Sequence, residues 1–493
     1  MDRNRLLFHL MPPQGWMNDP NGLCQFQGVY HVFFQYSPES PRGGNKSWGH
    51  YTSPDMIYWT YQGEPLRPDK NFDRDGVFSG SAFVHDGKMY LYYTGNVEQE
   101  GVHDYVHTGR EANTILVTSE DGTVFSKKQC IMTNADYPSE YTCHIRDPKV
   151  WQQDGYFYMI QGGRLIGDKG AVLIFQSEDL VHWKFYKDIT TEYDFGFMWE
   201  CPDYFLLSAK AEENMETFGV SEIISGEEKS LQGILSLSPQ GLAAQEYCYQ
   251  NIYQSGYFLV QGDILDRPSL GEFIEWDMGF DFYAPQTFVD EQGRRILIGW
   301  AGLADEEYDN EPTIRNGWQH ALTVPRELSW KNGRVCQNPV EELLKLRLDE
   351  QRIKPKDCIV LLDDWKKNGA KAYEICVENI ASQDFSLNLS QNGSGLFLRY
   401  EKGVFSLGFF GEDALEMGRG RKLRKVLLEQ LRECRILLDT SLIEIYLNQG
   451  EVVLTSRYYL LEKHCENGSA FTLQLGEGYF QGSIWQWKGE GDE

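Results

Sequence analysis

The sequence predicts an all-β protein in which about five similar units form a β-propeller and a second all-β domain follows. Aromatic residues make up 14% of the 493 residues and there are 48 glycines, which is typical of short strands joined by tight turns. One strand pattern recurs along the first two thirds of the chain, and a different alternating pattern follows it. The length also favours more than one domain.

The recurring unit has the pattern of a β-hairpin. A turn that contains glycine precedes a short strand rich in aromatic or β-branched residues, which we interpret as the second strand of the hairpin. The copies are QGVYHVFFQY (27–36), DGKMYLYYTG (86–95), DGYFYMIQGG (154–163), SGYFLVQGDI (255–264) and QGRRILIGWAG (292–302). Such repetition favours a propeller, and a large β-sandwich built of similar hairpins is the alternative.

Each unit is expected to open with an inner strand that begins with small or polar residues. These openings are NDPNGLCQF (18–26), FSGSAFV (78–84), IRDPKVW (145–151), WECPDYFLL (199–207) and YAPQTFV (283–289). In a propeller the innermost strand of each blade lines a central channel. We therefore expect the first side chains of these strands to face one funnel.

The repeat ends near residue 335, and a helix is expected next. In NPVEELLKLRLDEQRI (338–353), Asn338 can cap a helix, Pro339 suits the first helical position and Glu341 is placed for a capping box. Alternating runs at 384–390 and 441–459 predict hairpins of the second all-β domain. The expected division is a propeller domain over 1–335, a helical linker over 336–354 and a second domain over 355–493.

Composition limits the range of partners. The formal net charge of −27 disfavours nucleic acid and anionic membranes, so a neutral substrate or one met by local positive charge is expected. No apolar run reaches the roughly 18–20 residues of a membrane span, and the first residues lack the features of a signal peptide. The ten cysteines have no paired spacing and are expected to be free. We predict a cytoplasmic protein, and a homo-oligomer is left open.

Three acids stand beside prolines at the starts of predicted inner strands: Asp19, Asp147 and Glu200. Paired carboxylates are what glycoside cleavage requires. Neighbouring donors such as Asn18 should keep Asp19 ionised, apolar residues before Glu200 should raise its pKa, and Arg146 should lower the pKa of Asp147. Each acid alone has a structural alternative, as a turn residue or an ion-pair partner. Their equivalent positions in different repeats favour catalysis.

Other side chains are less specific. Five aromatic residues near the inner strands could stack on a sugar ring or belong to the core: Trp16, Trp48, Phe78, Trp199 and Tyr283. The basic segment 418–425 and the acidic segment 304–311 are expected to be exposed loops. The ten histidines are dispersed along the chain, and no metal is expected.

Five segments in order resemble glycoside hydrolase family 32, the β-fructofuranosidases: 16–22 (WMNDPNG), 78–81 (FSGS), 146–148 (RDP), 200–201 (EC) and 282–288 (FYAPQTF). The resemblance continues to PREL (325–328) and into 438–457. It implies a five-bladed propeller followed by a C-terminal β-sandwich. It also implies release of terminal β-D-fructofuranosyl residues from sucrose and short fructo-oligosaccharides, with retention and without a metal or organic cofactor.

By position in this resemblance, Asp19 is the expected nucleophile, Glu200 the general acid/base and Asp147 the carboxylate that stabilises the transition state. The expected substrate-binding residues are Asn18, Gln35, Trp48, Phe78, Ser79, Arg146 and Tyr283.

The loop 39–47 departs from the family. Many relatives carry a tryptophan near its middle, where this chain has Gly43 or its neighbours. Without this aromatic wall, Arg42, Asn45 and Lys46 should be available to a substrate, and we hypothesise that sucrose is not the best one; the alternative is that Trp48 fills the space. Sucrose-6-phosphate hydrolysis and fructosyl transfer are rival activities. A non-catalytic fructan-binding propeller is disfavoured because all three acids are present.

Overall fold

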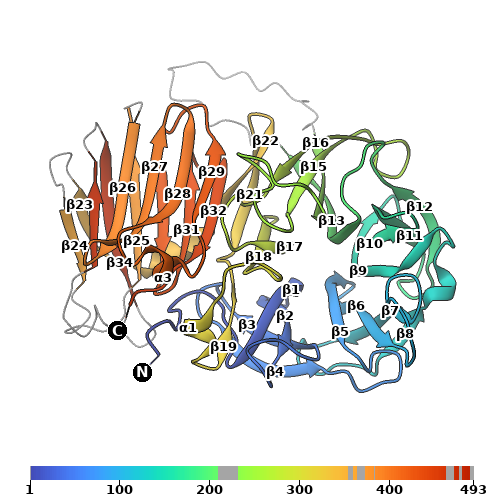
Figure 1. The fold of residues 1–493 in the computed structure, drawn as a ribbon. Helices are drawn as coiled ribbons and strands as arrows, with labels where there is room; N and C mark the ends of the chain where they lie inside the picture. Colours follow the sequence, from blue (N-terminus) through green and yellow to red (C-terminus); the bar gives the residue numbers. More distant parts are fainter. Residues whose placement is uncertain are drawn as a thin grey trace, which may run out of the picture.

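The computed structural model describes residues 2–208, 231–353, 359–363, 372–381, 384–461, 471–476 and 480–488. These residues form almost only strands and loops. Five sheets are arranged around a central axis, and two further sheets lie beside them (Figure 1). The chain is therefore a five-bladed β-propeller followed by a β-sandwich, as predicted. Within the described ranges, no helix is long and apolar enough to cross a membrane.

The blades follow one another along the chain. The first contains β1 (Gly15–Phe26), β2 (Val29–Ser37), β3 (Ser47–Ser53) and β4 (Thr60–Leu66). The second contains β5 (Val77–His85), β6 (Lys88–Glu98), β7 (Arg110–Ser119) and β8 (Gln129–Met132), and the third β9 (Tyr141–Gln153), β10 (Tyr156–Leu165), β11 (Lys169–Ser177) and β12 (Lys184–Ile189). A 3₁₀ turn, η1 (Asn134–Asp136), joins these two blades.

The fourth blade contains β13 (Met198–Ser208), β14 (Leu231–Gln240), β15 (Gly256–Gln261) and β16 (Ser269–Glu275). The fifth contains β17 (Tyr283–Val289), β18 (Arg295–Ala301), β21 (Arg326–Lys331) and β22 (Arg334–Pro339), with β20 (Ala321–Leu322) paired to β18. Helix α1 (Glu311–Ile314) precedes β19 (Trp318–Gln319), which pairs in parallel with β1. This last pairing joins the end of the propeller to its beginning.

The predicted inner strands are β1, β5, β9, β13 and β17, and Figure 1 places them nearest the axis. Turn chemistry explains three of the hairpins that follow. The central turn residues Gln27–Gly28, Asp86–Gly87 and Asp154–Gly155 all have positive φ, between 47° and 83°. Type I′ turns require this conformation and match the twist of the strands.

The fourth repeat differs from the sequence interpretation. Residues 255–264 contain β15, the third strand of its blade, because β14 (Leu231–Gln240) is the second. The segment LQGILSLSPQ was not among the predicted hairpin strands, and its Gly233 lies inside β14 and not in a turn before it. The error therefore came from a strand whose partner is distant in sequence.

The segment 336–354, which was expected to be a helical linker, is mostly strand. Strand β22 reaches Pro339, only Glu341–Leu346 is helical, as the 3₁₀ turn η2, and β23 takes Arg347–Ile353. Val340 precedes η2 without a side-chain cap, and the predicted cap Asn338 is paired within β22. Pairing of both flanking segments outweighs the local helical signal, because tertiary contacts override weak propensities.

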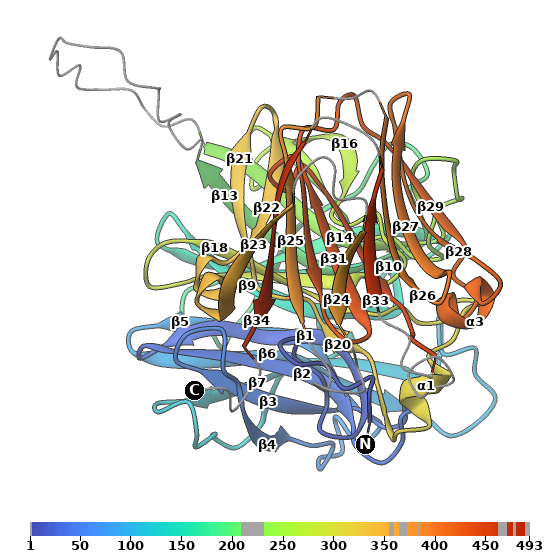
Figure 2. The ribbon, with the colours of Figure 1, turned by 90° about the vertical axis from the view of Figure 1, so that its left-hand side faces the viewer.

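The sandwich consists of two six-stranded sheets, seen side by side in Figure 2. One contains β23, β34 (Gln481–Trp487), β25 (Tyr373–Glu378), β30 (Cys434–Leu438), β31 (Leu442–Leu447) and β32 (Val452–Arg457). The other contains β24 (Ile359–Asp363), β33 (Phe471–Leu475), β26 (Asp384–Gln391), β27 (Ser394–Glu401), β28 (Val404–Phe410) and β29 (Leu423–Leu427), with α3 (Ala414–Gly418) after β28. Their facing side chains form one apolar cluster that includes Leu387, Leu407 and Ile436.

Buried ion pairs join the sandwich to the propeller. Arg326 on β21 contacts Asp277 at 3.1 Å and Glu444 on β31 at 2.6 Å, with all three side chains fully buried. Arg421 contacts Asp281 at 2.7 Å, also fully buried. The basic segment 418–425 was expected to be a solvated loop, and this expectation is wrong because Arg421 binds the propeller.

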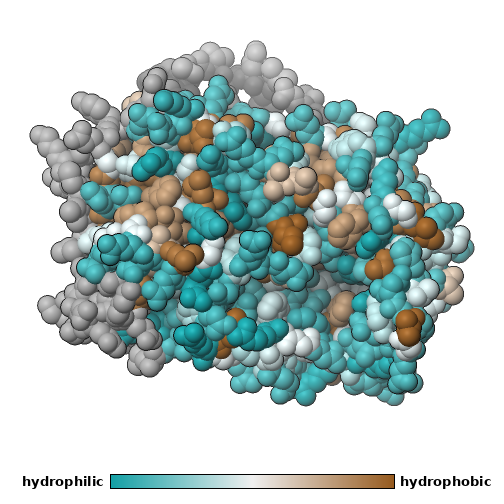
Figure 3. Space-filling model, viewed as in Figure 1, coloured by the Kyte–Doolittle hydropathy of each residue, from teal (hydrophilic) through white to brown (hydrophobic). Residues whose placement is uncertain are grey.

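The surface agrees with the acidic, polar composition. The face shown in Figure 3 is mainly hydrophilic, and its apolar side chains occur in small groups. The eight cysteines within the described residues are all free, as expected.

Candidate active site

All five inner strands contain an irregularity near their starts. In each, the regular pairing with the neighbouring strand skips two residues. The skipped pairs are Asn18–Asp19 in β1, Phe78–Ser79 in β5, Asp147–Pro148 in β9, Cys201–Pro202 in β13 and Ala284–Pro285 in β17. Such bulges redirect side chains and are frequent beside active sites. The prolines have no N–H to lose from the ladder, which explains their repeated position.

A cavity of about 370 Å³ lies where these bulges meet. It brings together nine of the ten residues predicted from the sequence, which come from all five blades. They are Asn18, Asp19, Gln35, Phe78, Ser79, Arg146, Asp147, Glu200 and Tyr283. The predicted convergence of the inner strands on one funnel is therefore what the fold produces.

Asp19 is held by a polar network. The Ser79 hydroxyl donates to Oδ2 at 2.5 Å and the Asn18 amide donates to Oδ1 at 3.1 Å. Gln35 fixes both donors, because its Nε2 donates to Ser79 Oγ and its Oε1 accepts from Asn18. Burial nevertheless raises the pKa of Asp19, against the effect of the Ser79 hydrogen bond. The sequence argument considered the hydrogen-bond donors to Asp19 but not that burial, which removes water from the carboxylate, raises its pKa.

Glu200 has polar partners on both oxygens. Arg146 donates from Nε and Nη2 to Oε1, at 3.0 and 2.7 Å. Oε2 accepts from Gln240 and from the Tyr283 hydroxyl, both at 2.7 Å. The apolar surroundings expected from the preceding residues are absent at this carboxylate, because Trp199 points into the core instead.

Asp147 is buried, and its Oδ2 accepts from the backbone N–H of Cys201 at 2.9 Å. Burial raises its pKa to about 7, although the charge of Arg146 acts in the opposite direction. The predicted lowering of this pKa is wrong, because the Arg146 guanidinium makes its hydrogen bonds to Glu200. Both residues line the cavity, but the burial of Asp147 has a larger effect on its pKa than the charge of its neighbour.

This raised pKa predicts a pH-dependent effect of Asp147→Asn on stability. Between about pH 4 and pH 7 the folded state keeps a proton on Asp147 that the unfolded state has lost, so the contribution of this group to stability falls as the pH rises. Asparagine does not ionise. We therefore expect Asp147→Asn to raise the Tm relative to wild type by more at pH 8 than at pH 5.

Thermal unfolding of wild type and variant at both pH values measures this difference. Asp154→Asn, which changes an exposed carboxylate in the turn between β9 and β10, is the matched control. An Asp147→Asn shift of equal size at the two pH values would contradict the prediction.

Trp48 is the predicted site residue that the structure does not bring to the cavity. Its side chain is fully buried between the first two blades, where it packs near Phe33 and Tyr93. Its Nε1 donates to the carbonyl oxygen of Phe78 at 3.0 Å. Trp48 therefore supports the strand that carries Phe78, and its expected contact with substrate is corrected to this indirect role.

Two further cavity residues, Trp16 and Lys46, were considered in the sequence analysis as a stacking surface and as a cation available to substrate. The cavity residues that it did not name are Arg110, His144, Gln240, Tyr253, Trp300, Ala304 and Asp305. One of them comes from a segment that the sequence interpretation missed, since Gln240 ends the unpredicted strand β14. Asp305 is an exposed residue of the segment 304–311, which is a loop up to residue 310 as expected, and it nevertheless lines the cavity. No local sequence motif identifies such residues, because it is the fold of each blade that brings them to the cavity.

The structure shows where the side chains of the loop 39–47 lie relative to the cavity. Trp16 lies beside Gly43, 3.7 Å from the point where a Cβ would be, so the nearby aromatic wall is Trp16 and not Trp48. Arg42 is exposed and forms an ion pair with Glu311. Lys46 lines the cavity, with Nζ 5.0 Å from the centre of the Trp16 ring. Of the two cations expected to be available in this loop, Lys46 is the one at the site.

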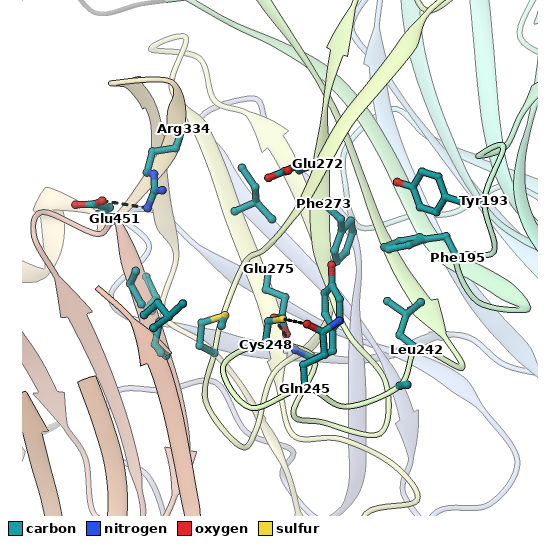
Figure 4. A pocket seen from close by; sticks show the side chains of 18 of the residues that line it. Tyr193, Phe195, Leu242, Gln245, Cys248, Glu272, Phe273, Glu275, Arg334 and Glu451 are labelled. Atoms are coloured by element: carbon teal, nitrogen blue, oxygen red, sulfur yellow. Dashed lines mark hydrogen bonds and ion pairs between the residues drawn. The ribbon is translucent and has the colours of Figure 1, made fainter. Parts of the chain in front are cut away.

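A larger cavity, about 700 Å³, lies between the fourth blade and the sandwich (Figure 4). Its labelled side chains include Tyr193 and Phe195 on one side and Arg334, paired with Glu451, on the other. None of the predicted site residues lines it. The smaller cavity, where three acids meet, is therefore the candidate active site.

Comparison with known proteins agrees with this assignment. Two family models match: the N-terminal domain of glycosyl hydrolases family 32 over residues 9–339, and the C-terminal domain of this family over 408–478. A sucrose-6-phosphate hydrolase of Bacillus subtilis is 38% identical over 475 residues, covering 93% of this chain and 89% of the relative. A raffinose invertase of Escherichia coli is 35% identical, covering 92% and 89%.

Solved structures show the same fold. A sucrose-6-phosphate hydrolase from Lactobacillus gasseri superposes with a TM-score of 0.83 at 26% identity, covering 99% of this chain and 94% of that one. A β-fructofuranosidase from Bombyx mori superposes with a TM-score of 0.79 at 27% identity, with the same coverage.

Proposed function

Because the chain belongs to glycoside hydrolase family 32, we propose that it releases terminal β-D-fructofuranosyl residues from sucrose and short fructo-oligosaccharides, with retention at the anomeric carbon. The chain is a glycosidase, and the specific roles of its residues are our proposal. The observation that carries them is the meeting of Asp19, Asp147 and Glu200, from three different blades, in one cavity.

In the first step, Asp19 attacks the anomeric carbon of the fructosyl unit. Glu200 gives its proton to the glycosidic oxygen, the bond from this oxygen to the anomeric carbon breaks, and the remaining sugar leaves. Ser79 and Asn18 orient the attacking carboxylate through their hydrogen bonds. Arg146 stabilises the negative charge that Glu200 acquires when it loses its proton.

In the second step, a water molecule gives a proton to Glu200 and its oxygen attacks the same carbon. The ester bond to Asp19 breaks, and β-fructofuranose is released. Each of the two displacements inverts the anomeric carbon, so together they retain its configuration. Asp147, fixed by the Cys201 N–H, hydrogen-bonds the ring hydroxyls of the fructosyl unit.

Trapping of the intermediate with methanol tests this proposal. Sucrose incubated with the enzyme in dilute methanol should yield methyl β-D-fructofuranoside, which NMR distinguishes from its α-anomer. The α-anomer as the first product would exclude retention, and the absence of any fructose release would exclude the proposed activity.

Sucrose 6-phosphate is a second candidate substrate. The observation that favours it is Lys46, a cation in the cavity with no ion pair among the described residues. The relatives from Bacillus subtilis and Lactobacillus gasseri named above are sucrose-6-phosphate hydrolases, and this supports the candidate. A cytoplasmic location, which would suit a substrate phosphorylated during uptake, stays a prediction.

A further inference from the structure

The rim of the cavity carries an arc of four aromatic rings with opposite charges at its two ends. Neighbouring ring centres are 6.2 Å apart from Trp16 to Trp300, 6.3 Å from Trp300 to Tyr283 and 5.8 Å from Tyr283 to Tyr253. Lys46 lies over the first ring, with Nζ 5.0 Å from its centre. Asp305 stands at the other end, where its Oδ2 accepts from the Tyr253 hydroxyl at 3.1 Å.

All six side chains line the cavity that holds the three acids. The arc passes the proposed proton donor, because the Tyr283 hydroxyl donates to Glu200 at 2.7 Å. The group that leaves is the one whose oxygen Glu200 protonates. The arc therefore borders the space that a leaving sugar occupies, and aromatic rings are suitable surfaces for sugar stacking.

Lys46 is the cation in this cavity that is free to meet an anion. The guanidinium of Arg146 is bound to Glu200, and that of Arg110 donates to Asn96 and Glu98. Lys46 has no ion pair among the described residues. Burial lowers its pKa to about 8, against the attraction of Asp19, so the ammonium is still mainly protonated at neutral pH.

Asp305 has the opposite character. It is an exposed carboxylate on the loop between β18 and α1. The Tyr253 hydroxyl is the hydrogen-bond donor to its carboxylate described above, and the remaining acceptor positions can take hydroxyl groups of an uncharged sugar. A phosphate dianion close to this carboxylate would be repelled.

We propose that Lys46 and Asp305 together determine which leaving group the enzyme prefers. Lys46 binds the phosphate of a glucosyl 6-phosphate unit, and Asp305 favours the uncharged glucosyl unit. This inference rests on the proposed fructofuranosidase activity. A charge-assisted hydrogen bond is stronger than a neutral one, so the loss of Lys46 should have the larger effect.

The test compares kcat/KM for sucrose and for sucrose 6-phosphate in four proteins: wild type, Lys46→Met, Asp305→Asn and Arg42→Gln. Lys46→Met should lower the ratio of kcat/KM for sucrose 6-phosphate to kcat/KM for sucrose at least tenfold, because any effect of the lost charge on Asp19 is common to both substrates. Asp305→Asn should raise the ratio of kcat/KM for sucrose 6-phosphate to kcat/KM for sucrose at least threefold. Arg42→Gln, an exposed cation of the same loop that is paired with Glu311, should leave the ratio unchanged.

Lys46→Arg should recover part of the phosphate activity, which a structural role of Lys46 would not explain. Equal losses on both substrates in Lys46→Met, an unchanged ratio, or no turnover of the phosphate by wild type would overturn the inference. In each of these cases the fructofuranosidase proposal survives if wild type hydrolyses sucrose. If wild type releases fructose from neither compound, it is the proposed function that fails.

Discussion

Asp19→Asn is expected to lower kcat/KM for sucrose by a factor on the order of 10⁴, with the fold intact. The substitution removes the nucleophile and with it the covalent path, so only binding and the remaining electrostatic effects are left. The cavity should tolerate asparagine, since it has nearly the same shape and burial already disfavours the charge of Asp19, whose pKa is raised.

Circular dichroism and thermal unfolding check the fold of this variant, and initial rates of fructose release measure its activity. Ser79→Ala is a graded comparison, because it removes one donor to Asp19 and leaves the carboxylate in place. We expect it to lose roughly 10- to 100-fold, as a hydrogen bond to a charged group contributes about 1.5–3 kcal/mol. An Asp19→Asn protein that keeps a tenth of the wild-type kcat/KM would rule out Asp19 as nucleophile.

Glu200→Ala should produce a different pattern. Sucrose hydrolysis should fall by roughly 10²–10⁴-fold, because general acid–base catalysis is lost, while an aryl fructoside with a good leaving group should still form the fructosyl enzyme. The truncated side chain leaves space beside Arg146, whose guanidinium loses its carboxylate partner. A small anionic nucleophile such as azide should enter this space.

Azide is therefore expected to restore turnover of the aryl fructoside and to yield β-fructosyl azide, identified by NMR and mass spectrometry. Asp19→Asn is the control, since it forms no fructosyl enzyme for azide to attack. If Glu200→Ala loses activity equally on sucrose and on the aryl fructoside and azide has no effect, Glu200 is not the acid/base. Formation of the α-azide would argue against a double displacement.

The prediction from sequence worked best where a signal is local. Positive-φ turns such as Asp86–Gly87 mark hairpins in the sequence because few residue pairs adopt this conformation. Proline beside an acid marked the starts of two inner strands at Asp19 and Asp147, and the structure has bulges at both positions, where backbone groups lack a ladder partner. Each of these features is decided by two or three neighbouring residues.

The errors arose where distant segments compete. The segment around η2 (Glu341–Leu346) has helical signals, but its flanks pair as strands β22 and β23. Trp48 resembles a stacking residue in the sequence, yet packing between two blades buries it completely. The basic segment 418–425 has the composition of a solvated loop, but Arg421 finds a buried partner in Asp281, 140 residues away.

By itself, the sequence determined the all-β class, the five inner strands and the three acids, since short-range turn geometry and alternation specify them. Only the tertiary structure decided which way Arg146 points, how burial shifts the pKa values of Asp19 and Asp147, and that Lys46 and Asp305 share one rim. Desolvation and charge pairing depend on everything within several ångströms, and in a propeller those neighbours come from all five blades. No short stretch of residues contains that information.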